Sequence, residues 1–248
     1  MPVYNEIRTI DEIVARVAAV DVEKELIIVD DGSTDGTREY LEGLSRSRTV
    51  LSTKVRVIFH PKNAGKGAAL RTGFREAVGR ILVIQDADLE LDPREYERLI
   101  QPILSDSADV VYGSRFLGRK REEVPSLYFW GNKLLTLASN LATGLWLTDV
   151  WTGYKTFKRE VLNEIDLQEN RFGFEPEFTA KVAAHKWRVC EIPVSYTCRS
   201  PKEGKKLSWR DGFRGLGCTL YYGISSRLRF SGKTRALVTQ RGDVPVRS

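Results

Sequence analysis

The sequence predicts an α/β fold with a mostly parallel, twisted sheet and helices on both of its faces. Through the first half of the chain, short apolar runs alternate with segments of helical periodicity, which is the element order of parallel α/β proteins. Two of the apolar runs end in acidic clusters, Asp30-Asp31 and Asp86-Ala87-Asp88. Ligands of such sheets bind beyond the carboxyl ends of the strands, so these clusters mark the edge where a functional site is expected.

The elements of the first half follow one another closely. The first helix begins almost at the N-terminus, and its apolar stripe consists of Ile7, Ile10, Ile13 or Val14, and Val17. Few residues precede this helix, so the first strand of the sheet is expected to be largely missing from the given chain. Strands are then predicted at residues 24–33, 54–60, 80–88 and 108–114, and helices at residues 34–44, 65–78 and 93–104.

The second half is less regular. The pattern predicts a mostly apolar helix at 128–146, a short strand turning into a helix at 152–162, a helix at 174–187, a strand at 188–199 and a helix at 209–230. In the last of these, Leu216, Leu220, Tyr221 and Ile224 form an apolar stripe that suits packing on the domain or contact with a membrane. From Ser231 onward no periodicity continues, and a loose tail is expected.

Composition and charge narrow the class of protein. The chain has 248 residues, 42% of them apolar, and no run approaching the roughly 20 apolar residues of a membrane span. Three cysteines without metal or redox spacing and the lack of a leader pattern suggest a cytosolic protein. The net charge of +6 is concentrated after Arg199, a pattern that suits nucleic acid, phosphate-bearing ligands, an anionic membrane or a solvated tail. Only two histidines are present, which excludes a multi-histidine metal site.

An acidic segment follows the apolar run 81–84. In an extended chain, side chains at alternate positions point the same way, so Asp86, Asp88 and Glu90 would converge. Three neighbouring carboxylates repel one another, and a divalent cation would relieve that repulsion. The alternative is a simple turn, with Asp92-Pro93 starting the next helix.

The segment 63–70, NAGKGAAL, precedes a predicted helix and suits phosphate binding. Its small residues expose backbone N–H groups at the helix N-terminus, and Lys66 adds a positive charge. A tight turn with close helix packing explains the same residues. It is not a dinucleotide fingerprint, because Leu70 stands where the third glycine would fall.

Taken in order, several motifs resemble one family. PVYNE, VDDGSTDGT, NAGKGAALRTGF, QDADLELDP and YGSRF look like the series found in family-two glycosyltransferases with the GT-A fold. The later segments DVWTGYKTFKREVL, RFGFEPEFTAKV and EIPVSYTCRSPKEGKKLSWRDG are similar to the branch of dolichyl- and other polyprenyl-phosphate mannosyl- and glucosyltransferases. The resemblance covers roughly residues 2–215. It implies a single glycosyltransferase domain at 1–230, with a nucleotide-sugar-binding half at 1–115, an acceptor-side half at 116–230, and a loose basic tail at 231–248.

The resemblance also assigns roles to particular residues. It implies that Asp86 and Asp88 hold Mg²⁺ or Mn²⁺ on the donor diphosphate, with Glu90 as a further ligand. Arg115 would act with them as a catalytic cation beside the phosphates. The other substrate-binding positions are Pro2, Tyr4 and Glu6 for the base and ribose, Asp31 for the base, Val29 and Ala87 beside them, and Lys66, Arg199, Lys205 and Lys206 near the phosphates.

The expected activity is the inverting transfer of a hexose, mannose or glucose, from a GDP- or UDP-sugar to a polyprenyl phosphate. A phosphate acceptor is already anionic near neutral pH, so no strong general base is needed. Two alternatives stay open: transfer to a sugar or protein hydroxyl, with Asp149 or Glu175 as base, and an inactive nucleotide-sugar-binding module. The expected partners are the nucleotide sugar, the lipid phosphate and, by peripheral contact, the cytoplasmic face of a membrane, but not nucleic acid.

Overall fold

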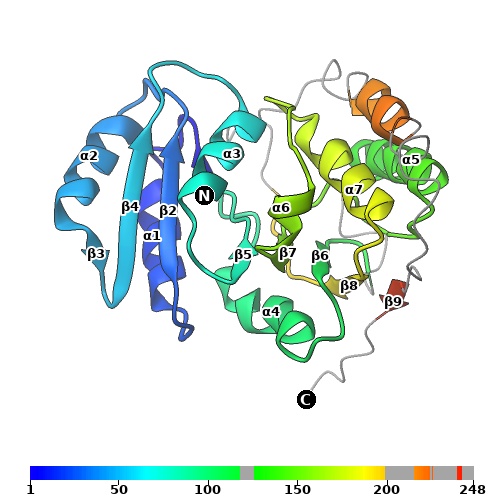
Figure 1. Ribbon diagram of the computed structural model, residues 1–248. Helices are drawn as coiled ribbons and strands as arrows, with labels where there is room; N and C mark the ends of the chain where they lie inside the picture. Colours follow the sequence, from blue (N-terminus) through cyan, green and yellow to red (C-terminus); the bar gives the residue numbers. More distant parts are fainter. Residues whose placement is uncertain (118–125, 199–214, 224, 226–238, 242–248) are drawn as a thin grey trace.

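A computed structural model of the protein describes residues 1–117, 126–198, 215–223, 225 and 239–241, and shows two sheets side by side, each covered by helices (Figure 1). The first sheet has the order β1-β2-β4-β3, and its first three strands in that order run parallel. Its strands are β1 (Pro2–Val3), β2 (Glu25–Asp30), β3 (Thr49–Val50) and β4 (Thr53–Phe59), and its helices are α1 (Ile10–Ala19), α2 (Thr37–Ser47) and α3 (Lys66–Glu76).

Both faces of the first sheet are buried, as β2 shows. Leu26 and Ile28 point into the core that contains Ile10 and Ile13 of α1. Ile27 and Val29 point to the opposite face, where they pack with residues of α3. A strand covered on both sides needs apolar residues at every position, which explains the unbroken apolar run.

The second sheet has the order β5-β7-β6-β8-β9, and it is mixed because β7 runs antiparallel to both of its neighbours. α7 covers one face, with Phe174 and Phe178 packed near Phe157 of β7. α4 covers the other face. The elements are β5 (Ile81–Val83), the 3-10 turn η1 (Pro93–Glu95), α4 (Tyr96–Leu104), β6 (Val110–Ser114), α5 (Ser126–Thr143), β7 (Lys155–Lys158), α6 (Val161–Glu164), α7 (Phe174–Ala184), β8 (Val189–Pro193) and β9 (Thr239–Arg241).

The predicted α/β class is confirmed, with three differences in detail. The strands form two sheets, and the antiparallel β7 was not foreseen. Ile7 precedes α1 and is 42% exposed, so the buried stripe of that helix begins at Ile10. Thr239–Arg241 pair with β8, whereas most of the predicted tail lies outside the described residues and stays a prediction. Among the described helices, none combines the length and apolarity needed to cross a membrane.

α3 lies between the two sheets (Figure 1), and the loop before α7 contacts its first turn, where the N–H of Ala68 donates to the carbonyl of Asn170 at 3.0 Å. Arg71 donates from Nη1 to the carbonyl oxygens of Gln168 and Glu169, at 2.9 and 2.6 Å. Gly65 caps the helix with φ of 103°, and its α-carbon faces the carbonyl of Asn170 so closely that a Cβ would collide with it. The loop before α7 is therefore held against the start of α3.

We expect Gly65→Ala to lower the free energy of unfolding by about 1–3 kcal/mol, because alanine at positive φ is strained and its Cβ meets Asn170. Urea denaturation followed by circular dichroism measures the change. Gly43→Ala is the matched control, because a Cβ there meets only the end of the Arg46 side chain at 3.9 Å. That control is expected to be neutral or to stabilise α2 by about 0.5–1 kcal/mol. Equal stability of the two variants would contradict the close packing at Gly65.

Candidate active site

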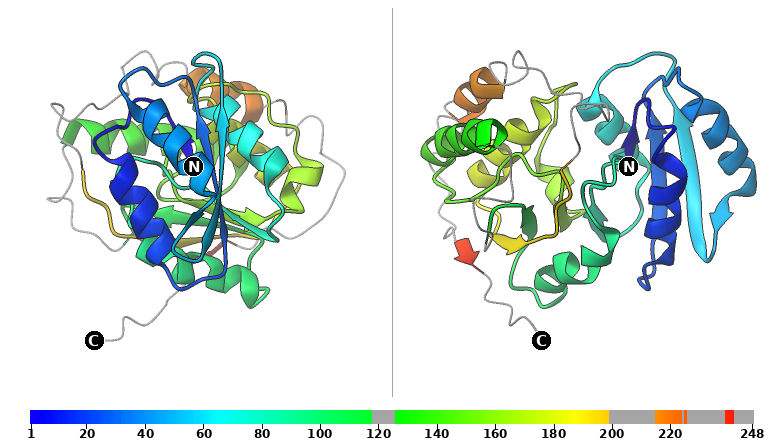
Figure 2. Two further views of the ribbon diagram at one scale, coloured as in Figure 1. Left: turned by 90° about the vertical axis from the view of Figure 1, so that its left-hand side faces the viewer. Right: turned by 180° about the vertical axis from the view of Figure 1, so that it is seen from behind.

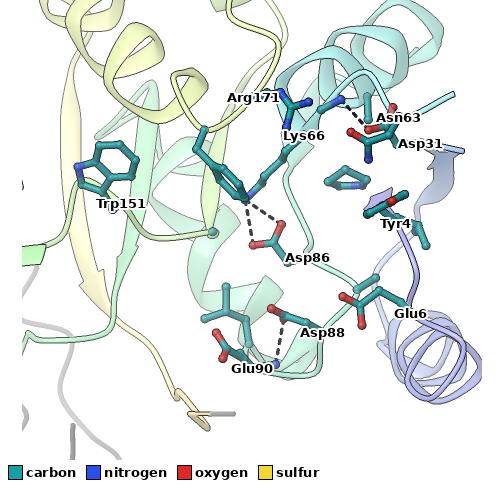
Figure 3. A pocket seen from close by; sticks show the side chains of 18 of the residues that line it. Tyr4, Glu6, Asp31, Asn63, Lys66, Asp86, Asp88, Glu90, Trp151 and Arg171 are labelled. Atoms are coloured by element: carbon teal, nitrogen blue, oxygen red, sulfur yellow. Dashed lines mark hydrogen bonds and ion pairs between the residues drawn. The ribbon is translucent and has the colours of Figure 1, made fainter. Parts of the chain in front are cut away.

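A cavity of about 350 Å³ opens where β1, β2, β5, β6 and β8 end (Figure 3). This is the edge of the sheets at which α/β proteins hold ligands. The lining residues are Pro2, Val3, Tyr4, Glu6, Asp31, Asn63, Gly65, Lys66, Ala69, Asp86, Ala87, Asp88, Glu90, Leu91, Arg115, Trp151, Gly153, Arg171, Phe172 and Tyr196.

Most of the residues expected to form a site come together in this cavity. Val29 is an exception, because it is buried in β2 as the sheet partner of Pro2. The three basic residues expected from the segment after β8, Arg199, Lys205 and Lys206, lie outside the described residues. The predicted residues that line the cavity are Pro2, Tyr4, Glu6, Asp31, Lys66, Asp86, Ala87, Asp88, Glu90 and Arg115.

One wall is formed by the turn after β1. Asn5 adopts a left-handed conformation, with φ of 52°, and its N–H donates to Ser33 Oγ at 2.9 Å. The N–H of Glu6 donates to Thr37 Oγ1 at 2.9 Å. The two motifs PVYNE and VDDGSTDGT thus hold each other in place, and Tyr4 and Glu6 line the cavity as a result.

Asp31 is a buried carboxylate that organises the loop before α3. It accepts hydrogen bonds from the backbone N–H groups of Ala64 and Gly65, at 3.0 and 2.7 Å. His60 Nδ1 lies 2.7 Å from Asp31 Oδ1. The neighbouring Asp30 points the other way, into a buried site beside Arg38. Only one of the two adjacent acids therefore faces the cavity.

Lys66 lies at the centre of the cavity floor, between two carboxylates. Its Nζ is 3.0 Å from Asp86 Oδ1 and 3.2 Å from Glu175 Oε1. Burial by itself would lower the pKa of Lys66, but these two carboxylates raise it above its ordinary value. Burial would likewise raise the pKa of Asp86, and the charge of Lys66 instead holds it below the usual range. Gly153 leaves room for Asp86, because any Cβ there would collide with that carboxylate.

The predicted convergence of three carboxylates after β5 is wrong. Leu89 has φ of 61°, so the chain bends at residues 87–90 and is not extended there. Asp86 turns to Lys66, whereas Asp88 Oδ1 accepts the N–H of Glu90 at 3.2 Å (Figure 3). Glu90 Oε2 accepts the hydroxyl of Tyr196 at 3.2 Å. Within the ranges that the structure describes, no group of three Asp, Glu, His or Cys side chains is arranged to hold a metal.

Two carboxylates nevertheless fit a divalent cation bound together with a ligand. Asp86 and Asp88 both line the cavity and supply hard oxygen donors. Mg²⁺ is usually held by one or two carboxylates, waters and the phosphates of a substrate, and not by a complete protein cage. The donor set therefore suits Mg²⁺ or Mn²⁺ shared with a diphosphate.

Arg115 is fixed by Asp149. Its Nε and Nη2 donate to the two oxygens of Asp149 at 2.7 and 2.9 Å, and Asn132 of α5 donates to the same carboxylate at 3.2 Å. Burial opposes the charge on Asp149, but Arg115 holds its pKa below the ordinary value. The guanidinium also lies over the ring of Tyr196, 5.3 Å from its centroid. Asp149 is fully buried and Glu175 is 4% exposed, and neither lines the cavity.

A buried lysine lies beneath the floor. Lys155 is 1% exposed and donates to the carbonyl oxygen of Thr152 at 2.6 Å. Burial lowers its pKa to about 8, against the opposing charge of Glu175. Glu175 Oε2 is itself buried without a hydrogen-bond partner in the described part of the chain. Lys66 and Asp86 on the cavity floor are thus backed by the buried Lys155 and Glu175, so that two basic and two acidic side chains lie together.

Several lining residues had no individual role in the prediction, although their segments belong to the motifs given above and Asn63, Gly65 and Ala69 lie in the segment 63–70 expected to bind phosphate. Arg171 reaches the cavity from the loop that Arg71 fastens to α3. Glu177 holds the same loop by accepting the N–H groups of Gln168 and Glu169, both at 2.8 Å. Tyr196 arrives from the end of β8. No local pattern marks these positions, since their neighbours in space are distant in sequence. The lining residues outside every predicted site are Val3, Leu91, Trp151, Gly153, Arg171, Phe172 and Tyr196.

Comparison with known proteins identifies a family and relatives that carry similar descriptions. A model of the family described as Glycosyl transferase family 2 matches residues 1–166. The chain is 30% identical over 216 residues to the undecaprenyl-phosphate mannosyltransferase of Micrococcus luteus, over 83% of this chain and 85% of that protein. It is 31% identical over 206 residues to the polyprenol monophosphomannose synthase of Mycolicibacterium smegmatis, over 80% of this chain and 76% of that protein.

The fold is also similar to a solved structure. Glucosyl-3-phosphoglycerate synthase from Mycobacterium tuberculosis, crystallised with Mn²⁺, UDP and glucosyl-3-phosphoglycerate, superposes with a TM-score of 0.66. The alignment covers 90% of this chain and 78% of that one, at 21% identity. At this identity the likeness supports the fold alone.

We expect Asp149→Asn to destabilise the protein by about 3–5 kcal/mol, because it leaves the guanidinium of Arg115 without its buried counter-charge. Urea denaturation of this variant and of the exposed control Asp21→Asn gives the difference. A general base in contact with substrate would instead show lost turnover at full stability. Unchanged unfolding free energy in Asp149→Asn would contradict the positioning role.

Lys155 predicts a pH dependence of stability. Its pKa falls from 10.5 to about 8 on folding, so the folded state binds fewer protons than the unfolded state between these pH values. The free energy of unfolding of the wild type should therefore rise with pH across this window, whereas that of Lys155→Met lacks this contribution. The advantage in stability of Lys155→Met over the wild type should shrink by about 1–3 kcal/mol from pH 7.5 to 10. Denaturant titrations at several pH values measure it, with the exposed Lys54→Met as control. A constant difference would contradict a neutralised Lys155.

Proposed function

This chain belongs to glycosyl transferase family 2 and has the predicted GT-A fold, and from that premise we propose that it transfers a hexose from a nucleoside diphosphate sugar to a polyprenyl phosphate. One observation carries the proposal. A single cavity combines a wall formed by Tyr4 and Glu6 with a floor formed by Asp86, Asp88 and Lys66. The first set suits a nucleoside, and the second set suits a diphosphate.

The wall of the cavity supports the donor assignment. Tyr4 offers a ring against which a base can stack, and the carboxylate of Glu6 can accept hydrogen bonds from ribose hydroxyls. Asp31 would contact the base while continuing to hold the loop 64–65. The donor is a GDP- or UDP-sugar carrying mannose or glucose, and the names of the two bacterial relatives favour mannose.

The floor supports departure of the diphosphate. Asp86 and Asp88 would hold Mg²⁺ or Mn²⁺, which when bound draws negative charge from the leaving nucleoside diphosphate. Lys66 remains protonated at neutral pH because its pKa is raised, and it keeps a cation beside the cavity. Arg115 and Arg171 add two guanidinium groups to the lining. Fixed cations of this kind stabilise charge that develops during the reaction.

The acceptor side favours a phosphate over a hydroxyl. Transfer to a hydroxyl needs a carboxylate base that reaches the acceptor. Asp149 is committed to Arg115 and Glu175 to Lys66, and both are buried behind the lining. A polyprenyl phosphate supplies an oxygen that is already anionic, so in-line positioning is the main requirement. Because such an acceptor is anchored in a bilayer, we place the protein peripherally at the cytoplasmic face of a membrane.

The test of the function is a turnover assay with GDP-mannose and UDP-glucose, in the presence of Mn²⁺ and a polyprenyl phosphate in detergent. Formation of a glycolipid phosphate with release of the nucleoside diphosphate supports the proposal. Equal transfer to free sugar hydroxyls supports the alternative acceptor class. If calorimetry detects donor binding but no acceptor is glycosylated, the protein is a nucleotide-sugar-binding module and not a transferase.

Asp88→Asn is expected to weaken Mn²⁺-dependent donor binding by about tenfold or more, because one hard oxygen ligand is replaced by a neutral amide. The half-buried position should keep the fold intact. Calorimetry with and without Mn²⁺ measures the loss, and the exposed Glu97→Gln on α4 is the control. An unchanged Mn²⁺-dependent affinity for the donor in Asp88→Asn would contradict the assignment of Asp88 as a metal ligand.

A further inference from the structure

α5 places its polar residues toward the protein interior. Thr136, Ser139 and Asn140 are buried, with 3%, 1% and 6% exposure. Asn140 donates to the carbonyl of Leu147 at 2.8 Å and accepts the N–H of the same residue at 3.1 Å. Asn132 contacts Asp149, as described above. The inner face of this helix is thus polar, with Asn132, Thr136 and Asn140 hydrogen-bonded and the buried hydroxyl of Ser139 without a partner in the described part of the chain.

The outer face of the same helix is apolar. Trp130, Leu134, Leu137 and Leu141 recur at intervals of four, three and four residues, which is the spacing of one helical stripe. Leu134 and Leu141 are 64% and 61% exposed, and Leu137 is 49% exposed. The helix of a water-soluble domain directs such a stripe to the core, so this orientation is reversed.

A second helix extends the apolar surface. The helical segment 215–223 lies beside α5 (Figures 1 and 2), and Gly223 packs so closely on Ala142 that no Cβ fits between them. This segment exposes Leu220 and Tyr221, and the turn after α5 exposes Trp146 at 60%. We define the α5 face as Leu134, Leu137, Leu141, Trp146, Leu220 and Tyr221. Several large exposed apolar side chains on adjacent elements mark a contact site.

The sequence around the α5 face is basic. The residues that lead into α5 include the run Arg119-Lys120-Arg121, which is followed by Glu122 and Glu123. Those that lead into the helical segment, 199–214, contain six Lys or Arg and two acidic residues. α5 itself carries only one charged residue, Lys133. An apolar surface bordered in sequence by cations matches a bilayer with anionic headgroups. A second copy of the chain would instead bring two basic borders together.

We propose that the α5 face is the surface by which this protein lies on an anionic membrane, with both helices in the plane of the headgroups. The proposal rests on the proposed function, which requires access to a lipid-anchored phosphate. Trp146 and Tyr221 have the amphipathic rings that favour the headgroup region. α5 and the helical segment enter the interface without crossing it, as amphipathic surface helices do.

The α5 face is connected to the cavity at two points. Trp151 lines the cavity, and its ring packs against Gly215 at the start of the helical segment. Phe116, next to Arg115, packs edge-on against Phe129 of α5 with centroids 5.4 Å apart. Docking of this face therefore brings the Arg115 side of the cavity to the membrane surface, where a lipid phosphate would enter.

The experiment is flotation of the full chain with vesicles of phosphatidylcholine and phosphatidylglycerol. The variant Leu134→Glu/Leu137→Glu should bind about tenfold or more weakly than wild type, because two exposed leucines no longer enter the apolar layer. The matched control is Leu51→Glu/Leu104→Glu, which changes two leucines of 72% and 56% exposure elsewhere on the surface. Wild-type and control proteins should also show a blue shift of tryptophan fluorescence on vesicles, which the α5 variant lacks.

The outcomes separate this inference from the proposed function. Transfer to a short, water-soluble prenyl phosphate should be equal in wild type and the α5 variant, while transfer to long-chain acceptor in vesicles falls in the variant only. If the α5 substitutions abolish vesicle binding and neither wild type nor variant transfers sugar, the membrane surface is supported and the proposed function is refuted. Equal flotation of the α5 variant and wild type overturns the surface. The surface is also overturned if the wild-type protein self-associates in sedimentation and does not bind vesicles, while the α5 variant is monomeric.

Discussion

The ion pairs of Lys66 hold together the region on which the rest of the site depends. Lys66 comes from the first turn of α3, Asp86 from the end of β5, and Glu175 from the start of α7. A half-buried ammonium is stabilised by opposite charges close to it, and these ion pairs join the three elements. Their meeting point is the floor of the cavity, where the ion pair with Lys66 also orients the Asp86 carboxylate.

Much of the fold could be predicted because it follows from local pattern. The buried strand β2 shows an apolar run, and α3 begins at Lys66, one residue after its predicted start. The positions of Asp31 and Asp86 at strand ends placed them in one cavity. The predicted convergence of Asp86, Asp88 and Glu90 is wrong because it assumed an extended chain. Leu89 has a left-handed backbone conformation, which the alternating positions of the acidic residues do not reveal. Arg171 and Tyr196 enter the cavity through long-range packing, which no short segment reveals.

α5 illustrates a different limit of sequence reasoning. Periodicity identified a mostly apolar helix, and an apolar stripe is ordinarily assigned to the core. The structure buries Thr136 and Asn140 instead, because the adjoining turn and Asp149 supply hydrogen-bond partners for that side of the helix. Hydrophobic periodicity defines a face, but it does not determine which medium that face meets. Only the three-dimensional neighbours decide between protein, water and lipid.

The hydrogen bonds of Asp31 have a consequence for the thermodynamics of recognition. The carboxylate already engages two backbone N–H groups of the loop before α3, and His60 lies within hydrogen-bonding distance. The conformational entropy of residues 64 and 65 is therefore lost when the protein folds, and not when a ligand arrives. Binding to such a preorganised wall carries a smaller ordering cost, so a larger part of the contact energy remains as affinity.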